Sequence, residues 1–145
     1  MPVLDPIAAL AGLFVFSFFA ATILPGSSEA ALVALILTDR YSVVALFLAA
    51  TAGNTAGGAA NWAIGRWLGH LSVFRTRLDP AKIERATVWF RRYGAWSLLL
   101  SWVPIIGDPL TVAAGLLRIG FVPFLVLVAI GKATRYAVLV AVIRP

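Results

Sequence analysis

Two carboxylates and three cations lie in or beside strongly apolar stretches of this chain. Glu29 and Asp108 each follow an apolar run that is broken by proline and glycine. A carboxylate at bilayer depth costs several kcal/mol unless it is paired, hydrated or protonated. Either acid could therefore exchange protons or hold a polar substrate. A structural role is the alternative: Asp108-Pro109 has the pattern of an N-cap before proline, and Glu29 follows Ser27 and Ser28 closely enough to lie in a first helical turn.

Two of the cations lie in the middle of the last apolar run. Lys132 and Arg135 stand three positions apart, so they share a helix face, and apolar residues on both sides make it difficult for them to reach water. Two roles are open. They could neutralise Asp108 and Glu29 in a buried network, or they could, together with Arg66, hold a lipid phosphate between helix N-termini.

Small residues recur every four positions in two segments, a spacing that lets helix backbones approach closely. The members are Gly53, Gly57, Asn61, Gly65 and Gly69 in the first segment, and Ala129, Ala133, Ala137 and Ala141 in the second. We expect both faces to pack against other helices. Asn54 and Asn61 are polar groups that could line a path for lipid, and Asn54 is included among the candidate substrate-binding residues.

Covalent and metal chemistry are not expected. The chain has no cysteine and one histidine, His70, which lies in a polar stretch. It contains no Gly-x-Ser-x-Gly elbow, no phosphate-binding Walker loop and no paired-histidine zinc motif. We therefore predict no catalytic residue, no metal site, no cofactor and no enzyme activity.

The composition predicts a membrane protein. Of 145 residues, 61% are hydrophobic and 12% are charged, whereas soluble domains carry about 25% charged residues. We expect residues 1–145 to form a single membrane domain. The formal charge of +6 comes mainly from seven basic residues between Arg66 and Arg92. The positive-inside rule places this loop, residues 68–93, in the cytoplasm, where it meets anionic headgroups, so no nucleic-acid partner is inferred.

Apolar runs define the expected elements, which are all helical. Ala30 to Leu37 would rise only about 12 Å as a helix, too little to cross alone. Asp79-Pro80 predicts the start of a short amphipathic helix, with Ile83, Ala86, Trp89 and Phe90 near one face, that lies on the membrane or serves as a solvated connector. The remaining runs are Ile7–Leu24, Tyr41–Trp67, Ala95–Ile106, Leu110–Leu117 and Phe121–Ile143, and tryptophans mostly flank them as interfacial anchors.

The two halves of the chain share a spacing. Pro25 precedes Glu29 by four positions, as Pro104 precedes Asp108. If each broken segment enters the bilayer and returns, the halves come out inverted, as in many transporters. The expected fold is an inverted repeat of a re-entrant helical hairpin plus a transmembrane helix, with repeat 1 at about residues 7–67 and repeat 2 at about 94–144.

Several motifs resemble the DedA membrane protein family, also called SNARE-associated or VTT-type, and in particular its short YqaA branch. The resemblance covers nearly the whole chain. It rests on residues 25–29 (PGSSE), 53–57 (GNTAG), 64–69 (IGRWLG), 91–94 (RRYG), 98–102 (LLLSW), 103–104 (VP), 107–108 (GD), 113–115 (AAG) and 131–136 (GKATRY). Asn54 stands where other branches have aspartate, and Ser101 and Gly107 stand where they have arginines.

The resemblance implies a multi-pass protein of the bacterial inner (plasma) membrane with opposed re-entrant hairpins. Glu29 looks like the family's embedded acid and Arg66 like the arginine of its glycine-arginine motif. The implied function is transport or scrambling of phospholipids or polyprenyl phosphates, with proton coupling, and the implied partners are membrane lipids. Two alternatives stay open: a non-transporting scaffold for membrane-protein assembly, and a proton-coupled exporter of small cations. Association into a homo-oligomer is also left open.

Overall fold

The computed structural model describes residues 4–22, 26–71, 79–103 and 106–145. Within these ranges the chain is helical and contains no strand. The prolines of the two predicted breaks, Pro25 and Pro104, and residues 72–78 of the basic loop lie outside the described residues. The helices are α1 (Pro6–Thr22), α2 (Ser27–Leu37), α3 (Val43–Ala63), η1 (Ile64–Leu68), α5 (Pro80–Tyr93), η2 (Gly94–Trp102), α6 (Gly107–Leu116) and α7 (Phe121–Ile143).

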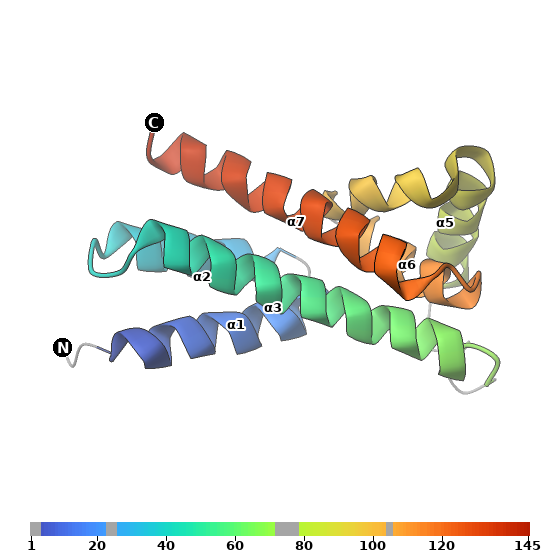
Figure 1. The fold of residues 1–145 in the computed structure, drawn as a ribbon, viewed down its shortest axis with the longest axis horizontal. Helices are drawn as coiled ribbons and strands as arrows, with labels where there is room; N and C mark the ends of the chain where they lie inside the picture. The colour runs from blue at the N-terminus through green and yellow to red at the C-terminus, as the bar shows by residue number, and fades with distance from the viewer. Residues whose placement is uncertain (1–3, 23–25, 72–78, 104–105) are drawn as a thin grey trace.

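Among the described residues, two helices are long and apolar enough to cross a membrane, as the apolar runs predict. One is α3, continued by the π-helical turn η1 to give 26 residues, and the other is α7 with 23. At 1.5 Å per residue they extend about 39 and 34 Å, which exceeds the roughly 30 Å of bilayer hydrocarbon. Ser42 starts α3 by accepting a hydrogen bond from the Ala45 N–H. The two long helices run in opposite directions along the molecule (Figure 1).

The shorter helices form two pairs that approach the middle of the molecule from opposite ends (Figure 1). In the first pair, α1 ends and α2 begins near the middle, and α1 packs along α3. In the second pair, η2 and α6 do the same from the other end, with η2 packed on α7. The apolar run that begins at Ala95 is a nine-residue 3-10 helix, although such helices seldom exceed four residues.

The short helices α2 and α6 end in the same way. The second residue after each helix has a left-handed backbone, Asp39 with φ 55° and Arg118 with φ 59°. After α6 the N–H groups of Arg118 and Ile119 donate to the carbonyls of Gly115 and Ala114, which is the Schellman pattern. Asp39 and Arg118 are 79 positions apart, as are Glu29 and Asp108.

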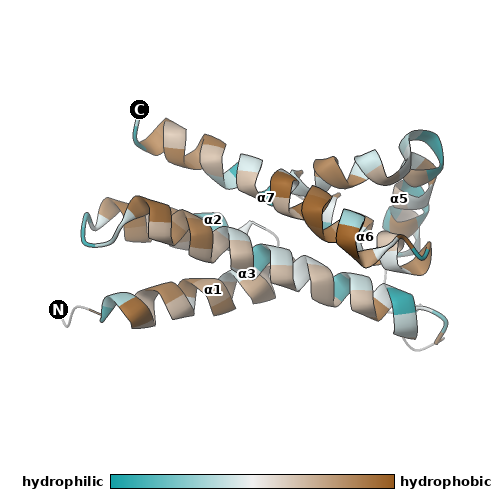
Figure 2. Cartoon of the chain, in the orientation of Figure 1, coloured by the Kyte–Doolittle hydropathy of each residue, from teal (hydrophilic) through white to brown (hydrophobic). Residues whose placement is uncertain are grey.

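Hydrophobic residues cover most of the helices, and hydrophilic residues lie in the connections and α5 at the ends of the molecule and in short bands within α3 and α7 (Figure 2). The amphipathic helix α5 lies across one end (Figure 1). It begins as predicted, because the Asp79 carboxylate accepts a hydrogen bond from the Ala81 N–H and Pro80 follows. Ala86 and Phe90 are buried against the other helices, whereas Trp89 is 40% exposed.

The glycine face of α3 packs as predicted. A side chain at Gly53 or Gly57 would collide with the backbone of α1, and one at Gly65 would collide with the Val112 carbonyl of α6. The alanine face of α7 is not fully packed against other helices of the chain, because Ala137 and Ala141 are exposed. Among the tryptophans, Trp62 is buried against Phe121 and Phe124 and donates to the Ile119 carbonyl. Its predicted role as an interfacial anchor is therefore wrong.

Candidate functional site

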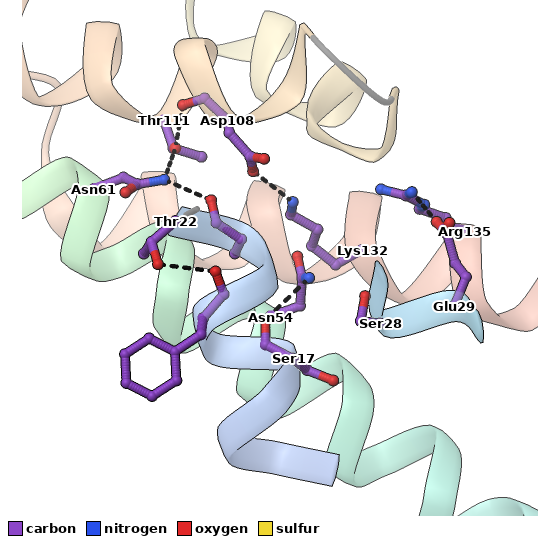
Figure 3. A network of polar contacts seen from close by, with 12 residues as sticks. Ser17, Thr22, Ser28, Glu29, Asn54, Asn61, Asp108, Thr111, Lys132 and Arg135 are labelled. Atoms are coloured by element: carbon purple, nitrogen blue, oxygen red, sulfur yellow. Dashed lines mark hydrogen bonds and ion pairs between the residues drawn. The ribbon is translucent and has the colours of Figure 1, made fainter. Parts of the chain in front are cut away.

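Two ion pairs join the short helices to α7 in the middle of the molecule (Figure 3). Asp108, in the first turn of α6, accepts from the Lys132 ammonium at 3.4 Å between Oδ1 and Nζ. Glu29, in the first turn of α2, pairs with the Arg135 guanidinium. Because Lys132 and Arg135 are one helical turn apart on α7, the two short helices meet the same face of this span. The buried network considered from the sequence is therefore present as two separate pairs.

The cations are more deeply buried than the acids. Lys132 is 2% exposed and Arg135 14%, whereas Asp108 and Glu29 are 25% and 26% exposed. A buried ammonium costs several kcal/mol without a counterion, so Lys132 depends on Asp108. Each carboxylate gains a second favourable interaction from the positive N-terminal end of its own helix. The first turns of α2 and α6 are thus suited to hold negative charge.

The N-cap prediction for Asp108 is wrong. Helix α6 starts at Gly107, with Ile106 at the N-cap, so the Asp108 carboxylate is inside the first turn and turns to Lys132. The first-turn position predicted for Glu29 is confirmed, although Gly26 occupies the N-cap of α2 with φ 88°. The Glu29 carboxylate lies 3.7 Å from the position that a β-carbon at residue 26 would occupy.

A hydroxyl contact strengthens the junction between α2 and α7. The hydroxyls of Ser28 and Tyr136 lie 2.7 Å apart and share a buried hydrogen bond. Ser28 precedes Glu29 and Tyr136 follows Arg135, so two adjacent contacts join these helices. The side chains of Ser17 and Asn54 also lie near the Tyr136 hydroxyl. The α2 end of the site is therefore lined with oxygen atoms.

The asparagines of α3 connect the elements around the site. Asn54 donates from Nδ2 to the Ser17 carbonyl of α1 at 3.3 Å. Asn61 donates to the Ala21 carbonyl at 3.1 Å and to the Thr111 hydroxyl of α6 at 3.2 Å. Asn61 thus links the end of α1 to the second pair of helices (Figure 3). Asn54 is 4% exposed, and its Oδ1 atom has no hydrogen-bond partner within the described residues.

Arg66 is not brought to the two ion pairs. It lies in η1, where its backbone packs against Gly115 near the C-terminal end of α6. Gly115 is seven residues from Asp108, a rise of about 10 Å along the helix. Within the described part of the chain, Arg66 forms no ion pair. Of the six candidate residues, the structure brings together four as two pairs, places Asn54 beside the Ser17 carbonyl, and leaves Arg66 apart.

Sequence reasoning missed Ser28, Tyr136 and Thr111 as parts of this site. The available signal was position: Ser28 and Tyr136 adjoin the two charged partners, and hydroxyl groups in apolar segments seek hydrogen bonds. The spacing of Lys132 and Arg135 did identify the correct helix face. It could not identify which acid each cation meets, because that depends on how far the short helices reach.

Residues 4–144 match the VTT domain. The chain is 43% identical over 133 residues to the inner membrane protein YqaA of Escherichia coli K12, covering 92% of this chain and 89% of that protein. It is 37% identical over 148 residues to an uncharacterized protein of Haemophilus influenzae, covering 94% and 88%. The undecaprenyl phosphate transporter A of Staphylococcus aureus is 27% identical over 102 residues, covering 64% and 50%.

No solved structure matches the chain. The family is nevertheless clear, because the domain match spans almost all residues and the YqaA likeness extends over most of both chains. The apolar helices agree with relatives named as inner membrane proteins. The chain is therefore a membrane protein of the DedA family, whose members carry the VTT domain.

Proposed function

We propose that this protein moves phosphate-bearing lipids, either phospholipids or polyprenyl phosphates, between the leaflets of the bacterial inner membrane. The observation that carries the proposal is the pair of acids in the middle of an apolar molecule, each ion-paired to a cation on one face of α7. Such charges are costly in hydrocarbon and mark substrate or proton pathways in membrane proteins. The name of the Staphylococcus aureus relative, an undecaprenyl phosphate transporter, agrees with a lipid phosphate as substrate.

In this proposal the α1–α2 and η2–α6 pairs are re-entrant hairpins in an inverted repeat. The opposite directions of α3 and α7 support it (Figure 1). So does the common spacing of 79 positions that relates Glu29 to Asp108 and Asp39 to Arg118. Two opposed hairpins that meet near the midplane would thin the barrier to a polar headgroup while the acyl chains stay in the bilayer. The basic loop and α5 would lie on the cytoplasmic side.

The ion pairs suggest how a headgroup is passed. A proton that binds the Asp108 or Glu29 carboxylate neutralises it and frees the ammonium of Lys132 or the guanidinium of Arg135. The freed cation then pairs with a phosphate oxygen of the lipid, because a buried cation requires an anion. When the lipid leaves, the carboxylate releases its proton and pairs with the cation again. Lipid movement would in this way be coupled to proton exchange.

Reconstitution into liposomes tests the proposal. Vesicles containing labelled phospholipid, or a labelled polyprenyl phosphate, should equilibrate between leaflets faster with the wild type than with the Glu29→Gln, Asp108→Asn double variant. The matched control is Asp39→Asn, since Asp39 also forms an ion pair, with Arg144, but is 74% exposed near the C-terminal end of α2. The control should keep the wild-type rate.

Equal rates for the wild type and the double variant would refute the coupling mechanism. No lipid movement by folded wild type would favour the scaffold, which predicts tolerance of the neutralised acids and sensitivity to Gly57→Leu or Gly65→Leu. Proton flux that depends on a small cation without lipid movement would favour the exporter. The two buried cations argue against that exporter, since they would repel its substrate.

A further inference from the structure

A pocket of about 100 Å³ lies between α5 and the start of α6, apart from the two ion pairs. Its α5 wall is formed by Lys82, Arg85, Ala86 and Trp89, and its α6 wall by Ile106 and Pro109. Pro109 follows Asp108 directly, and consecutive helical residues point about 100° apart. The pocket therefore adjoins the first turn of α6 on a different side from α7, which the Asp108 carboxylate faces.

One side of this pocket carries unbalanced positive charge. Lys82 and Arg85 are three positions apart on α5 and share its face. In the part of the chain that the structure describes, neither is within ion-pair distance of a carboxylate, including Glu84 on the same helix. Asp79, the other acid nearby, caps α5 through the Ala81 N–H. An anion in the pocket would therefore meet two available cations.

The other side of the pocket is apolar. Ile106 is 44% exposed, and Trp89, which closes the pocket from α5, is 40% exposed. Exposed tryptophans beside cations are typical of segments at the boundary between headgroups and acyl chains. The combination fits a ligand that has an anionic group and an apolar portion attached to it.

We infer that this pocket binds the anionic headgroup of a phospholipid, with Lys82 and Arg85 on the phosphate and Trp89 and Ile106 against the glycerol and upper acyl chain. On the proposed function, the pocket would be where a lipid enters from the cytoplasmic leaflet before its headgroup reaches Asp108. The binding itself does not require transport. A protein that binds lipid here without moving it would lose the proposed function and keep this site.

Lipid binding to the full-length protein tests the site. The protein in detergent is titrated with phosphatidylglycerol, with phosphatidylcholine or with inorganic phosphate, and the bound species are resolved by native mass spectrometry. We expect phosphatidylglycerol to occupy one site more tightly than phosphatidylcholine. Lys82→Gln with Arg85→Gln should weaken it at least tenfold, the loss expected for one charge-assisted hydrogen bond. Inorganic phosphate at the same concentration should not displace the lipid.

The matched control removes the same charge from the same helix. Arg91→Gln with Arg92→Gln lies outside the pocket and should change the affinity less than threefold. Ile106→Glu, which introduces a negative charge from the α6 wall, should reproduce the tenfold loss without altering α5. The site would be overturned if the Arg91→Gln, Arg92→Gln variant lost as much lipid affinity as the Lys82→Gln, Arg85→Gln variant. It would also be overturned if Ile106→Glu bound phosphatidylglycerol as tightly as the wild type. Displacement by free phosphate would overturn the choice of a lipid.

Discussion

The Asp108–Lys132 pair should respond unequally to removal of its two members. Asp108→Asn leaves the Lys132 ammonium, 2% exposed, without a counterion, whereas Lys132→Met leaves a carboxylate that is 25% exposed. The partly exposed carboxylate can be hydrated or take up a proton, whereas the enclosed ammonium has no second carboxylate within ion-pair distance among the described residues. Loss of one member of a buried pair costs about 3–5 kcal/mol. We therefore expect Asp108→Asn to reach this range and Lys132→Met to fall below it.

The double variant separates the charge effect from the packing effect. Replacing both members with apolar or neutral groups of similar size removes the unpaired charge, and such replacements are often neutral or stabilising. Asp108→Asn with Lys132→Met should therefore be more stable than Asp108→Asn alone. For a chain of this length, 1 kcal/mol corresponds to about 3 °C in Tm. Asp108→Asn should then lower the melting temperature by about 10 °C, and the second substitution should restore most of it.

Thermal unfolding in detergent, followed by tryptophan fluorescence, measures these differences. Asp39→Asn serves as the control, because its partner Arg144 is 45% exposed and remains hydrated, and should shift the melting temperature by no more than about 2 °C. A larger loss for Lys132→Met than for Asp108→Asn would refute the reasoning from burial. Additive losses in the double variant would show that the two residues do not interact energetically.

Three further perturbations test the packing and the orientation. Gly65→Ala should lower the free energy of unfolding by about 1–3 kcal/mol, because the added methyl group meets the Val112 carbonyl. Gly12→Ala should be neutral or slightly stabilising, because nothing packs within 4 Å of the added methyl group. The melting temperatures of the two variants test this difference. Tyr136→Phe should cost about 1–3 kcal/mol by removing the buried 2.7 Å hydrogen bond, which denaturation of the two proteins would measure. Single cysteines at two exposed positions on either side of the α3–η1 span, Thr38→Cys at the end of α2 and His70→Cys after η1, should react with a membrane-impermeant thiol reagent from opposite sides of the membrane. Labelling of both from one side would contradict a crossing α3.

The long helices could be predicted from the sequence because their apolar runs have the length that a bilayer requires. The α5 start was predicted equally well, since Asp79 and Pro80 carry the local signal for a helix N-terminus. The common face of Lys132 and Arg135 followed from their spacing. In each of these cases the deciding interaction is local, or it depends only on the thickness of the membrane.

The failures concern interactions between distant segments. Trp62 is buried because Phe121 and Phe124 of α7 pack on it, and Asn61 links α1 to Thr111 of α6. The four-residue spacing placed Asn61 on a packing face but did not identify its partners, and no periodic pattern marked Trp62 for burial. Periodicity identifies a helix face and does not say which partner covers it.

The 3-10 winding of η2 increases the distance that this segment extends along α7, on which it packs. Nine residues of 3-10 helix extend about 18 Å, and the same nine residues wound as an α-helix would extend about 13.5 Å. If η2 were α-helical, it would therefore be about 4.5 Å shorter, which is the rise of about three residues along α7. Its end would then lie level with Ala129 instead of Lys132. An apolar methyl group would then stand opposite the carboxylate. The narrower, longer coil lets a short segment deliver Asp108 to the one nearby ammonium in α7.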